Sequence, residues 1–172
     1  MRIAIHQSNF MPWYPFFQKM AQCDVFVILV HCQYEKNGWQ NRCMVNGKWW
    51  TKPITKGTAP IVNKRYVDNQ RLIDVNIPFI YGMARVLGID TKKIVLDYPT
   101  ELTGTERLID IIKHFNGDEY LTNLEAFGKY LDKEKVEKAG IKIVPFKTQY
   151  KKHVFEMFDL YGVDRTIRRL ND

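Results

Sequence analysis

Apolar and polar residues alternate along the first part of the chain in a way that predicts two buried strands around one helix. Residues 2–5 form a short apolar run, and residues 24–30, DVFVILV, are nearly all β-branched or aromatic, as in a strand buried on both faces. Between them, residues 14–22 carry aromatic residues and a methionine at helical spacing. This succession is the minimal βαβ unit, so we expect the two strands to be parallel.

The same alternation continues in the second half of the chain. Residues 93–97 predict another buried strand, and residues 103–106 resemble a capping box that begins a helix closed by Gly117. The remaining expected elements are a strand at 119–122, helices at 124–131 and 133–139 with Gly140 as the helix end, and a last strand at 141–146. We therefore predict an α/β fold, a Rossmann-like and mostly parallel sheet flanked by helices, in a single domain spanning residues 1–172.

The middle of the chain is less regular. Asn46-Gly47 stands between Met44-Val45 and Trp49-Trp50, which is a strong signal for a two-residue β-hairpin. Residues 55–70 contain Gly, Pro and Asn without a clear period, so we expect an exposed connection there, followed by a short helix at 78–88. The hairpin is expected as an excursion from the sheet.

Composition excludes several classes of protein. A chain of 172 residues with 45% hydrophobic and 26% charged residues is typical of a globular domain and not of a disordered one. It has no secretory signal and no apolar run of the roughly 18 residues that cross a bilayer. Three cysteines without C-x-x-C spacing favour a reducing compartment and indicate no zinc site. We expect a cytoplasmic protein that holds no metal and contacts no membrane.

The net charge of +7 indicates an anionic partner. The basic residues are spread along the chain, with denser groups only at Lys151-Lys152 and near Arg165, Arg168 and Arg169, and no nucleic-acid-binding motif is present. We expect a small anionic substrate, with nucleic acid as the alternative partner. A solvated basic surface would explain the same charge.

Polar residues gather where the predicted strands end, and in an open α/β sheet ligands bind beyond the carboxyl ends of the strands. The stretches at these ends are His6 to Asn9, residues 30–34, Asp97 and Thr122-Asn123. His6 is the candidate catalytic residue because an imidazole titrates near neutrality, unless it is simply bonded to a backbone carbonyl. The candidate substrate-binding residues are Gln7, Asn9, Trp13, Gln33, Tyr34, Lys36, Trp39, Asn41, Arg42, Thr105, Glu106 and Arg107.

These candidates have distinct expected roles and structural alternatives. Lys36 and Arg42 would hold an anion, and the amide and aromatic side chains would orient it or support the hairpin. The helix that begins near residue 104 is a second anion site, unless Glu106 only caps the helix. Cys32 cannot form a dyad with His31, because neighbours in a strand point to opposite faces. Trp13 suits the core as well as a stacking surface.

Five segments together resemble the WbqC-like protein family. They are IHQSNFMPWYPFFQKMAQCDVFV, QYEKNGWQNR, GKWWTKPI, TERLIDIIKHFNGDEYLTN and YLDKEKVEKAGIKIVPF, in the order of the family's blocks. The matching positions are His6, Gln7, Asn9, Pro12, Trp13, Gln33, Tyr34, Lys36, Trp39, Asn41, Arg42, Thr105, Glu106, Arg107, Tyr120 and Leu121. The chain departs from the family where Val30 and His31 replace an acidic pair, where Cys43 replaces an asparagine, and in a shorter segment between residues 58 and 93.

The resemblance implies an α/β protein of a bacterial or phage-infected host cell. It further implies a transferase that moves a small acyl or aminoacyl group on a sugar, a nucleotide-sugar or a nucleotide-type anionic substrate. The loss of the acidic pair leaves an alternative, a phage binding protein with reduced catalysis that captures a nucleotide, a nucleic acid or a host protein. The sequence singles out no cofactor and no oligomeric state.

Overall fold

The first βαβ unit forms as its apolar pattern predicts. In the computed structural model, which describes residues 1–54, 66–67, 70–127 and 131–172, β1 (Arg2–Gln7) and β2 (Val25–Leu29) pair in parallel. They are joined by α1 (Tyr14–Ala21), which starts with a proline where the missing N–H breaks no helical hydrogen bond. The helix buries Tyr14 and Phe17 completely, and this burial fixes it on the sheet.

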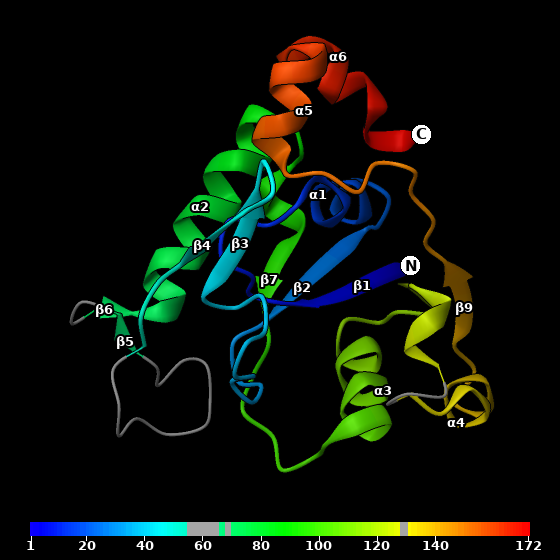
Figure 1. Cartoon of the computed structure of the whole chain (residues 1–172). Helices are drawn as coiled ribbons and strands as arrows, with labels where there is room; N and C mark the ends of the chain where they lie inside the picture. The colour runs from blue at the N-terminus through cyan, green and yellow to red at the C-terminus, as the bar shows by residue number, and fades with distance from the viewer. Residues whose placement is uncertain (55–65, 68–69, 128–130) are drawn as a thin grey trace.

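The predicted parallel sheet is confirmed. In the described part of the chain it has five strands in the order β7-β2-β1-β8-β9, completed by β7 (Ile94–Leu96), β8 (Glu119–Thr122) and β9 (Lys142–Pro145) (Figure 1). The chain builds outward from β1 to β2 and β7, and then crosses to the opposite side of β1 to add β8 and β9. The order of strands therefore reverses between β1 and β8.

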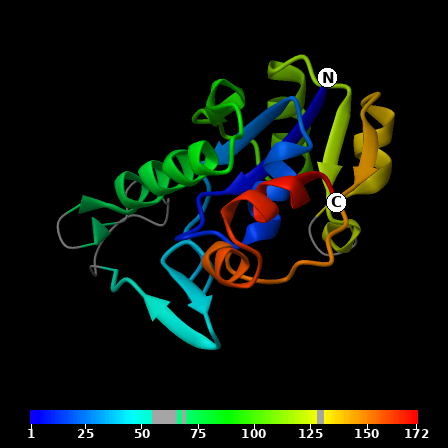
Figure 2. The ribbon, with the colours of Figure 1, turned by 90° about the horizontal axis from the view of Figure 1, so that it is seen from above.

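Helices cover both faces of the sheet (Figures 1 and 2). The helices beyond α1 are α2 (Leu72–Val86), α3 (Gly104–His114), α4 (Lys133–Lys138), α5 (Val154–Tyr161) and α6 (Val163–Arg168), with short 3-10 turns at Thr91–Lys93, Leu124–Ala126 and Arg169–Asn171. Ala4 and Phe26 face the layer of α1, α2 and α5, whereas Ile3 and Ile5 face α3 and α4. β1 is therefore buried on both faces, in the centre of the sheet.

Two predicted helices were wrong in their extent. α2 begins at Leu72 and not near residue 78, so Pro78 lies inside it. The buried face of α2, which includes Leu72 and Ile80, outweighs the roughly 3 kcal/mol that an interior proline costs. At 124–131 the described residues form a 3-10 turn and a bridge from Phe127 to Leu131, not the predicted helix, and residues 128–130 lie outside the description. α5 and α6 were not predicted.

The capping box at the start of α3 was also wrong. Thr103 takes the N-cap position, but its side chain accepts no hydrogen bond from the helix. The carboxylate of Glu106 instead pairs with Lys135 at 2.9 Å, and the hydroxyl of Thr105 accepts a hydrogen bond from the backbone N–H of Asp132. Both groups tie α3 to α4, because the fold brings α4 alongside the first turn of α3.

The predicted hairpin is confirmed. It consists of β3 (Arg42–Val45) and β4 (Lys48–Thr51), joined by Asn46 and Gly47 with φ of 50° and 73°. Two successive left-handed residues match the twist of the strands, as in type I′ turns. A smaller pair, β5 (Tyr66–Val67) and β6 (Gln70–Arg71), precedes α2. The predicted exposed connection at 55–70 lies mostly outside the described residues.

Among the described residues, no helix is both long and apolar enough to cross a membrane.

Candidate functional site

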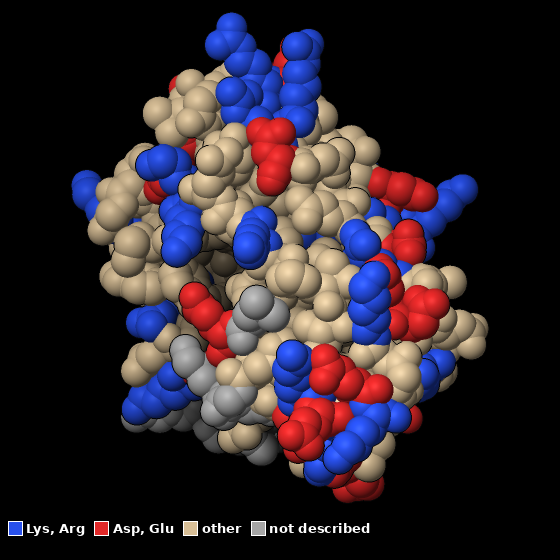
Figure 3. Space-filling view, turned by 90° about the vertical axis from the view of Figure 1, so that its right-hand side faces the viewer, with Lys and Arg blue, Asp and Glu red and all other residues tan. Residues whose placement is uncertain are grey.

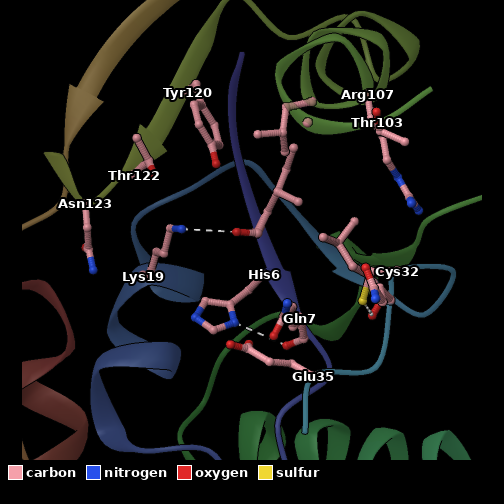
Figure 4. A pocket seen from close by; sticks show the side chains of 15 residues that line it. His6, Gln7, Lys19, Cys32, Glu35, Thr103, Arg107, Tyr120, Thr122 and Asn123 are labelled. Carbon is pink, nitrogen blue, oxygen red and sulfur yellow. Dashed lines mark hydrogen bonds between the residues drawn. The ribbon is translucent and has the colours of Figure 1, made fainter. Parts of the chain in front are cut away.

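A cavity of about 620 Å³ lies at the carboxyl ends of β1, β2 and β8, where the strand order reverses (Figure 4). It is called the main cavity below, and it is lined by Ile5, His6, Gln7, Lys19, Leu29, Cys32, Gln33, Glu35, Thr103, Gly104, Arg107, Leu108, Tyr120, Thr122 and Asn123. A reversal of strand order opens a crevice because successive loops leave the sheet in opposite directions. The cavity is therefore a product of the topology.

The crevice begins where β1 and β8 separate. Their pairing ends at Ala4 opposite Leu121, although β1 stays paired with β2 as far as Gln7. The N–H of Ser8 bonds to β2, and backbone groups alternate sides along a strand, so the carbonyl of Ile5 points toward β8. With β8 diverging, that carbonyl needs a partner other than a strand.

Lys19 of α1 supplies this partner. Its ammonium donates a hydrogen bond to the Ile5 carbonyl oxygen at 3.1 Å, and only 6% of the residue is exposed. Burial lowers the pKa of Lys19 to about 8, so the group is still mostly charged at neutral pH. An ammonium has three N–H donors, and the described residues use one of them. The charged Lys19 therefore lines the main cavity with N–H donors that the described residues do not use.

His6 lies beside Lys19 in the same cavity (Figure 4). Its Nδ1 is 3.2 Å from the carbonyl oxygen of Gln7, and because a carbonyl only accepts hydrogen bonds, Nδ1 carries the ring proton and Nε2 keeps a lone pair. The ring also packs edge-on against Phe16, with centroids 4.8 Å apart. Burial and the charge of Lys19 lower the pKa of His6 to about 3, well below the ordinary value of an imidazole.

Arg107 of α3 lines the other side of the main cavity, where Figure 4 shows it beside Thr103 and across β1 from Lys19 and Tyr120. Its guanidinium pairs with the buried carboxylate of Asp97 and donates to the carbonyl of His31 at 3.2 Å. Arg107 is therefore held in one orientation. Its Nε has no hydrogen-bond partner among the described residues.

The carboxylate of Asp97 holds the residues that follow β2 in place. It accepts hydrogen bonds from the backbone N–H groups of Val30 and His31 at 2.7 and 3.1 Å, and from Nδ1 of His31 at 3.1 Å. In the sequence, Val30 and His31 occupy the positions where the family has an acidic pair, which predicts no carboxylate at the end of β2. A carboxylate is nevertheless present there, supplied from the end of β7.

A second cavity of about 290 Å³ adjoins the first and shares His6 and Asn123 with it. Its remaining walls are mostly aromatic rings and prolines: Asn9, Phe10, Met11, Pro12, Trp13, Pro15, Phe16 and Trp39. The shared residues make the two cavities neighbours. A ligand that extends beyond the main cavity can therefore also contact the second cavity.

The structure brings about half of the predicted site residues together. His6, Gln7, Gln33 and Arg107 line the main cavity, and Asn9, Trp13 and Trp39 line the second. The predicted residues that line neither cavity are Tyr34, Lys36, Asn41, Arg42, Thr105 and Glu106.

Several of these outlying residues have structural contacts. The hydroxyl of Tyr34 donates to Asn41 at 3.0 Å, and the amide of Asn41 donates to the carbonyl of Lys52 at 2.8 Å, so both fasten the loop before β3. The guanidinium of Arg42 lies over the ring of Trp49.

Sequence reasoning placed Thr122 and Asn123 at the strand ends without giving them a binding role, and it did not select Lys19, Glu35 or Tyr120, although all five line the main cavity. Lys19 follows Phe16 by three residues, which places both on one face of α1 and was a usable signal. Tyr120 was visible only as a position matched by the family resemblance. Glu35 lies in the loop after β2 and has no such signal.

Cys32 lines the main cavity but is unsuited to act as a nucleophile. Burial first, and then the charge of Asp97, raises the pKa of its thiol to about 11, so the reactive thiolate is rare at neutral pH. Its neighbour His31 bonds to Asp97 instead. Within the described ranges, no group of three His, Cys, Asp or Glu residues is arranged to hold a metal ion.

Charged side chains lie around a hollow on one face of the molecule. Figure 3 shows several lysine and arginine side chains beside this hollow, with an acidic side chain at its border, and mixed charges near the lower edge. Basic groups beside a hollow raise the local concentration of anions.

Comparison with known proteins identifies one family. The WbqC-like protein family matches residues 7–69 and 51–159. The uncharacterized protein Rv1507c of Mycobacterium tuberculosis is 37% identical over 57 residues, which cover 31% of this chain. Those residues span 25% of that relative's own length. No solved structure matches the chain.

Proposed function

This chain belongs to the WbqC-like protein family, and from that premise we propose that it is a transferase. It moves a small acyl or aminoacyl group on an anionic sugar, nucleotide-sugar or nucleotide that binds in the main cavity. The observation that carries this proposal is the pair formed by Lys19 and His6. A buried ammonium and an unprotonated imidazole line the same cavity at the reversal of strand order.

Lys19 is suited to hold the anionic part of a substrate. Its charge sits in a poorly solvated position, where an ion pair with a carboxylate or phosphate is stronger than at the surface. The N–H donors that it does not use on Ile5 are available for that anion. Arg107, fixed by Asp97 on the opposite wall, provides a second cation.

His6 is suited to accept a proton from the group that attacks. Its Nε2 has a lone pair, and an anion bound beside Lys19 would raise the pKa of His6 from about 3 toward the range of a useful base. Burial is the larger cause of the lowered pKa of His6 and the charge of Lys19 is the smaller one, so a bound anion offsets the part of the shift that Lys19 produces.

The transfer step follows from these two roles. The amine or hydroxyl of the acceptor gives its proton to Nε2 of His6 while its nitrogen or oxygen attacks the carbonyl carbon of the donor. The bond from that carbon to the leaving group breaks, and the leaving group takes the electron pair and then the proton from His6. Lys19 or Arg107 stabilises the negative charge on the carbonyl oxygen.

A ligand screen tests the proposal. Melting curves of the protein are recorded with nucleotides, nucleotide-sugars, sugar phosphates and acyl donors, and any ligand that raises Tm is titrated by calorimetry. A ligand present at about 100 times its Kd stabilises the folded state by about 2.7 kcal/mol. We expect an anionic ligand to bind, and Lys19→Met to lower its affinity at least tenfold.

Lys93→Met is the matched control. Lys93 is also partly buried and donates to the carbonyls of Ala21 and Cys23, but it lies at the amino end of β7, away from the main cavity. The Lys93→Met substitution should lower Tm without changing ligand affinity. Equal losses of affinity in both variants, or no binding of any anionic ligand, would overturn the proposed site. A ligand pair that binds but yields no transferred group by mass spectrometry would overturn the transferase.

A further inference from the structure

Three tryptophans and one arginine form a continuous row that leads away from the second cavity. The ring centroids of Trp13 and Trp39 are 5.2 Å apart, and those of Trp39 and Trp49 are 5.3 Å apart. The guanidinium carbon of Arg42 lies 4.2 Å from the centroid of Trp49. We call these four residues the tryptophan row.

The row is built on one face of the hairpin. In the register of β3 and β4, Met44 stands opposite Trp49 and Arg42 opposite Thr51, so these four residues share a face, whereas Trp50 points to the other. The indole N–H of Trp13 donates to the carbonyl of Met44 at 3.0 Å and ties the row to this face. The rings are therefore held in place before any ligand arrives.

The outer part of the row is open to solvent. Trp39 is 41% exposed and Trp49 is 47% exposed. Exposed indole rings held side by side are costly in water, so such a surface usually serves to bind something. Flat faces of this kind suit ligands that are themselves planar, such as nucleic-acid bases.

The segment that carries the row is rich in basic residues, but they do not all share its face. Arg42 lies on the face of the row, whereas Lys48 lies on the face of Trp50, and the carboxylate of Glu156 accepts a hydrogen bond from the backbone N–H of Asn46 at the hairpin turn. Residues 36–52 contain four basic residues, Lys36, Arg42, Lys48 and Lys52, and no acidic one. This stretch alone holds four charges of the net +7 of the chain. A row of aromatic rings within a basic segment is the combination with which proteins bind single-stranded nucleic acids, because bases stack on the rings and phosphates meet the cations.

We propose that the tryptophan row is a binding site for single-stranded nucleic acid. Bases stack on Trp39 and Trp49, the phosphates between them meet Arg42 and the exposed Lys36, and the strand runs toward Trp13. A duplex keeps its bases stacked inside and cannot use the rings. This proposal does not require the transferase activity described above, although the row ends at the cavity that shares His6 with the main cavity.

The test is a fluorescence titration of the whole protein with an oligodeoxythymidine of about fifteen nucleotides, a length typical of single-strand sites. Stacking on indole rings quenches tryptophan emission, and anisotropy of a labelled oligonucleotide gives the Kd. We expect binding at roughly 50 mM salt that weakens about sevenfold by 200 mM, the effect of neutralising about two phosphates. The duplex of the same length should bind at least tenfold more weakly.

Variants separate stacking from charge. Trp39→Ala and Trp49→Ala should each lower the affinity about tenfold, as expected when one stacked base is lost. The matched control is Trp50→Ala, which removes an equally exposed tryptophan, 55% exposed, from the opposite face of the same strand, and it should leave the affinity unchanged. Arg42→Gln should reduce the dependence on salt. Because the three tryptophan side chains are exposed, far-UV spectra and Tm of their variants should stay those of the wild type.

Three outcomes would overturn the proposal. They are absence of oligonucleotide binding at low salt, an equal loss in Trp50→Ala, and binding of a neutral oligosaccharide with salt-independent affinity in place of the oligonucleotide. The Lys19→Met variant distinguishes this site from the main cavity. It should lose the small anionic ligand and keep the oligonucleotide, whereas Trp49→Ala should do the opposite.

Discussion

The ammonium of Lys19 lies 3.1 Å from the carbonyl oxygen of Ile5, at the level where β1 loses its pairing with β8. In a continuous parallel pair, that oxygen would accept a backbone N–H of the neighbouring strand. A lysine from the crossover helix does so instead, and it brings a positive charge into the cavity at the reversal of strand order. The same contact therefore gives the carbonyl of Ile5 its hydrogen bond and places a charged group in the main cavity.

The depressed pKa of Lys19 predicts how stability depends on alkaline pH. Its folded-state pKa is about 8, against 10.5 for a free lysine, so between these values the unfolded chain binds more protons than the folded one. This group therefore makes the free energy of unfolding rise with pH, by about 2 kcal/mol between pH 7 and 10. Lys19→Met should lack this contribution.

Urea denaturation of wild type and Lys19→Met across that range checks the prediction. The thiols of Cys32 and Cys43, with their pKa raised by burial, act in the opposite direction in both proteins and cancel in the difference. Burial also raises the pKa of Cys23, but the charge of Lys19 lowers it, so the comparison is repeated with Cys23→Ser in both proteins. A constant difference between the two proteins from pH 7 to 10 would mean that Lys19 is hydrated like a surface lysine.

His6 makes the corresponding prediction on the acid side. Its folded-state pKa is about 3 against 6.5 when free, so as the pH falls below 6.5 the unfolded chain takes up a proton that the folded chain does not. Stability is lost on acidification, by roughly 2 kcal/mol at pH 5 from this group alone. His6→Gln should lose about that much less between pH 7 and 5.

Thermal or urea denaturation at pH 7, 6 and 5 measures this difference. His153, whose pKa burial also lowers, adds the same acid sensitivity to both proteins and cancels. If His6→Gln and wild type lose stability in parallel, then His6 is freely protonated in the folded protein, and the neutral imidazole assigned to the main cavity is wrong.

Asp97 is expected to be the most sensitive polar residue of the site. Its side chain is fully buried and accepts hydrogen bonds from two backbone N–H groups and from His31, besides pairing with Arg107. Asp97→Asn leaves Arg107 without its counter-charge and should lower the free energy of unfolding by roughly 2 to 4 kcal/mol. Asp74→Asn, which breaks an ion pair with Arg71 at a carboxylate 46% exposed, should cost less than about 1 kcal/mol. Equal effects in urea denaturation would contradict the buried network.

Gly117 closes α3, as the sequence predicted, because its N–H donates to the carbonyl of Ile112 at 2.8 Å, and it is also required for close packing. The left-handed residue after α3 is Asn116, with φ of 54°. A Cβ on residue 117 would lie 2.3 Å from Cγ1 of Ile3 and 2.8 Å from Cγ2 of Ile112, both fully buried. Gly117→Ala should therefore destabilise the protein by about 1 to 3 kcal/mol, measured by urea denaturation.

A second glycine provides the control for this substitution. Gly82 lies inside α2, where an added Cβ would meet no atom within 4 Å, so Gly82→Ala should stabilise the helix by roughly 0.5 to 1 kcal/mol. If both substitutions have the same sign, the opposite packing of the two glycines described here is wrong.

The sequence by itself determined the elements whose signals are local. The β-branched run of β2 and the Asn46-Gly47 turn specify a buried strand and a hairpin, because strand burial and turn dihedrals depend on neighbouring residues. The order of strands and helices then sufficed to predict a parallel α/β sheet. It also located His6 and Gln7 at the edge of the sheet that borders the main cavity.

Only the tertiary structure decided which side chains form the site. Lys19 belongs to an ordinary helix, and its burial results from the divergence of β1 and β8, two strands more than a hundred residues apart in the chain. Asp97 lies beside Val30 and His31 because β7 ends next to β2. Glu106 pairs with Lys135 and does not cap α3, because α4 packs against α3. Such contacts depend on long-range packing, which no local pattern encodes.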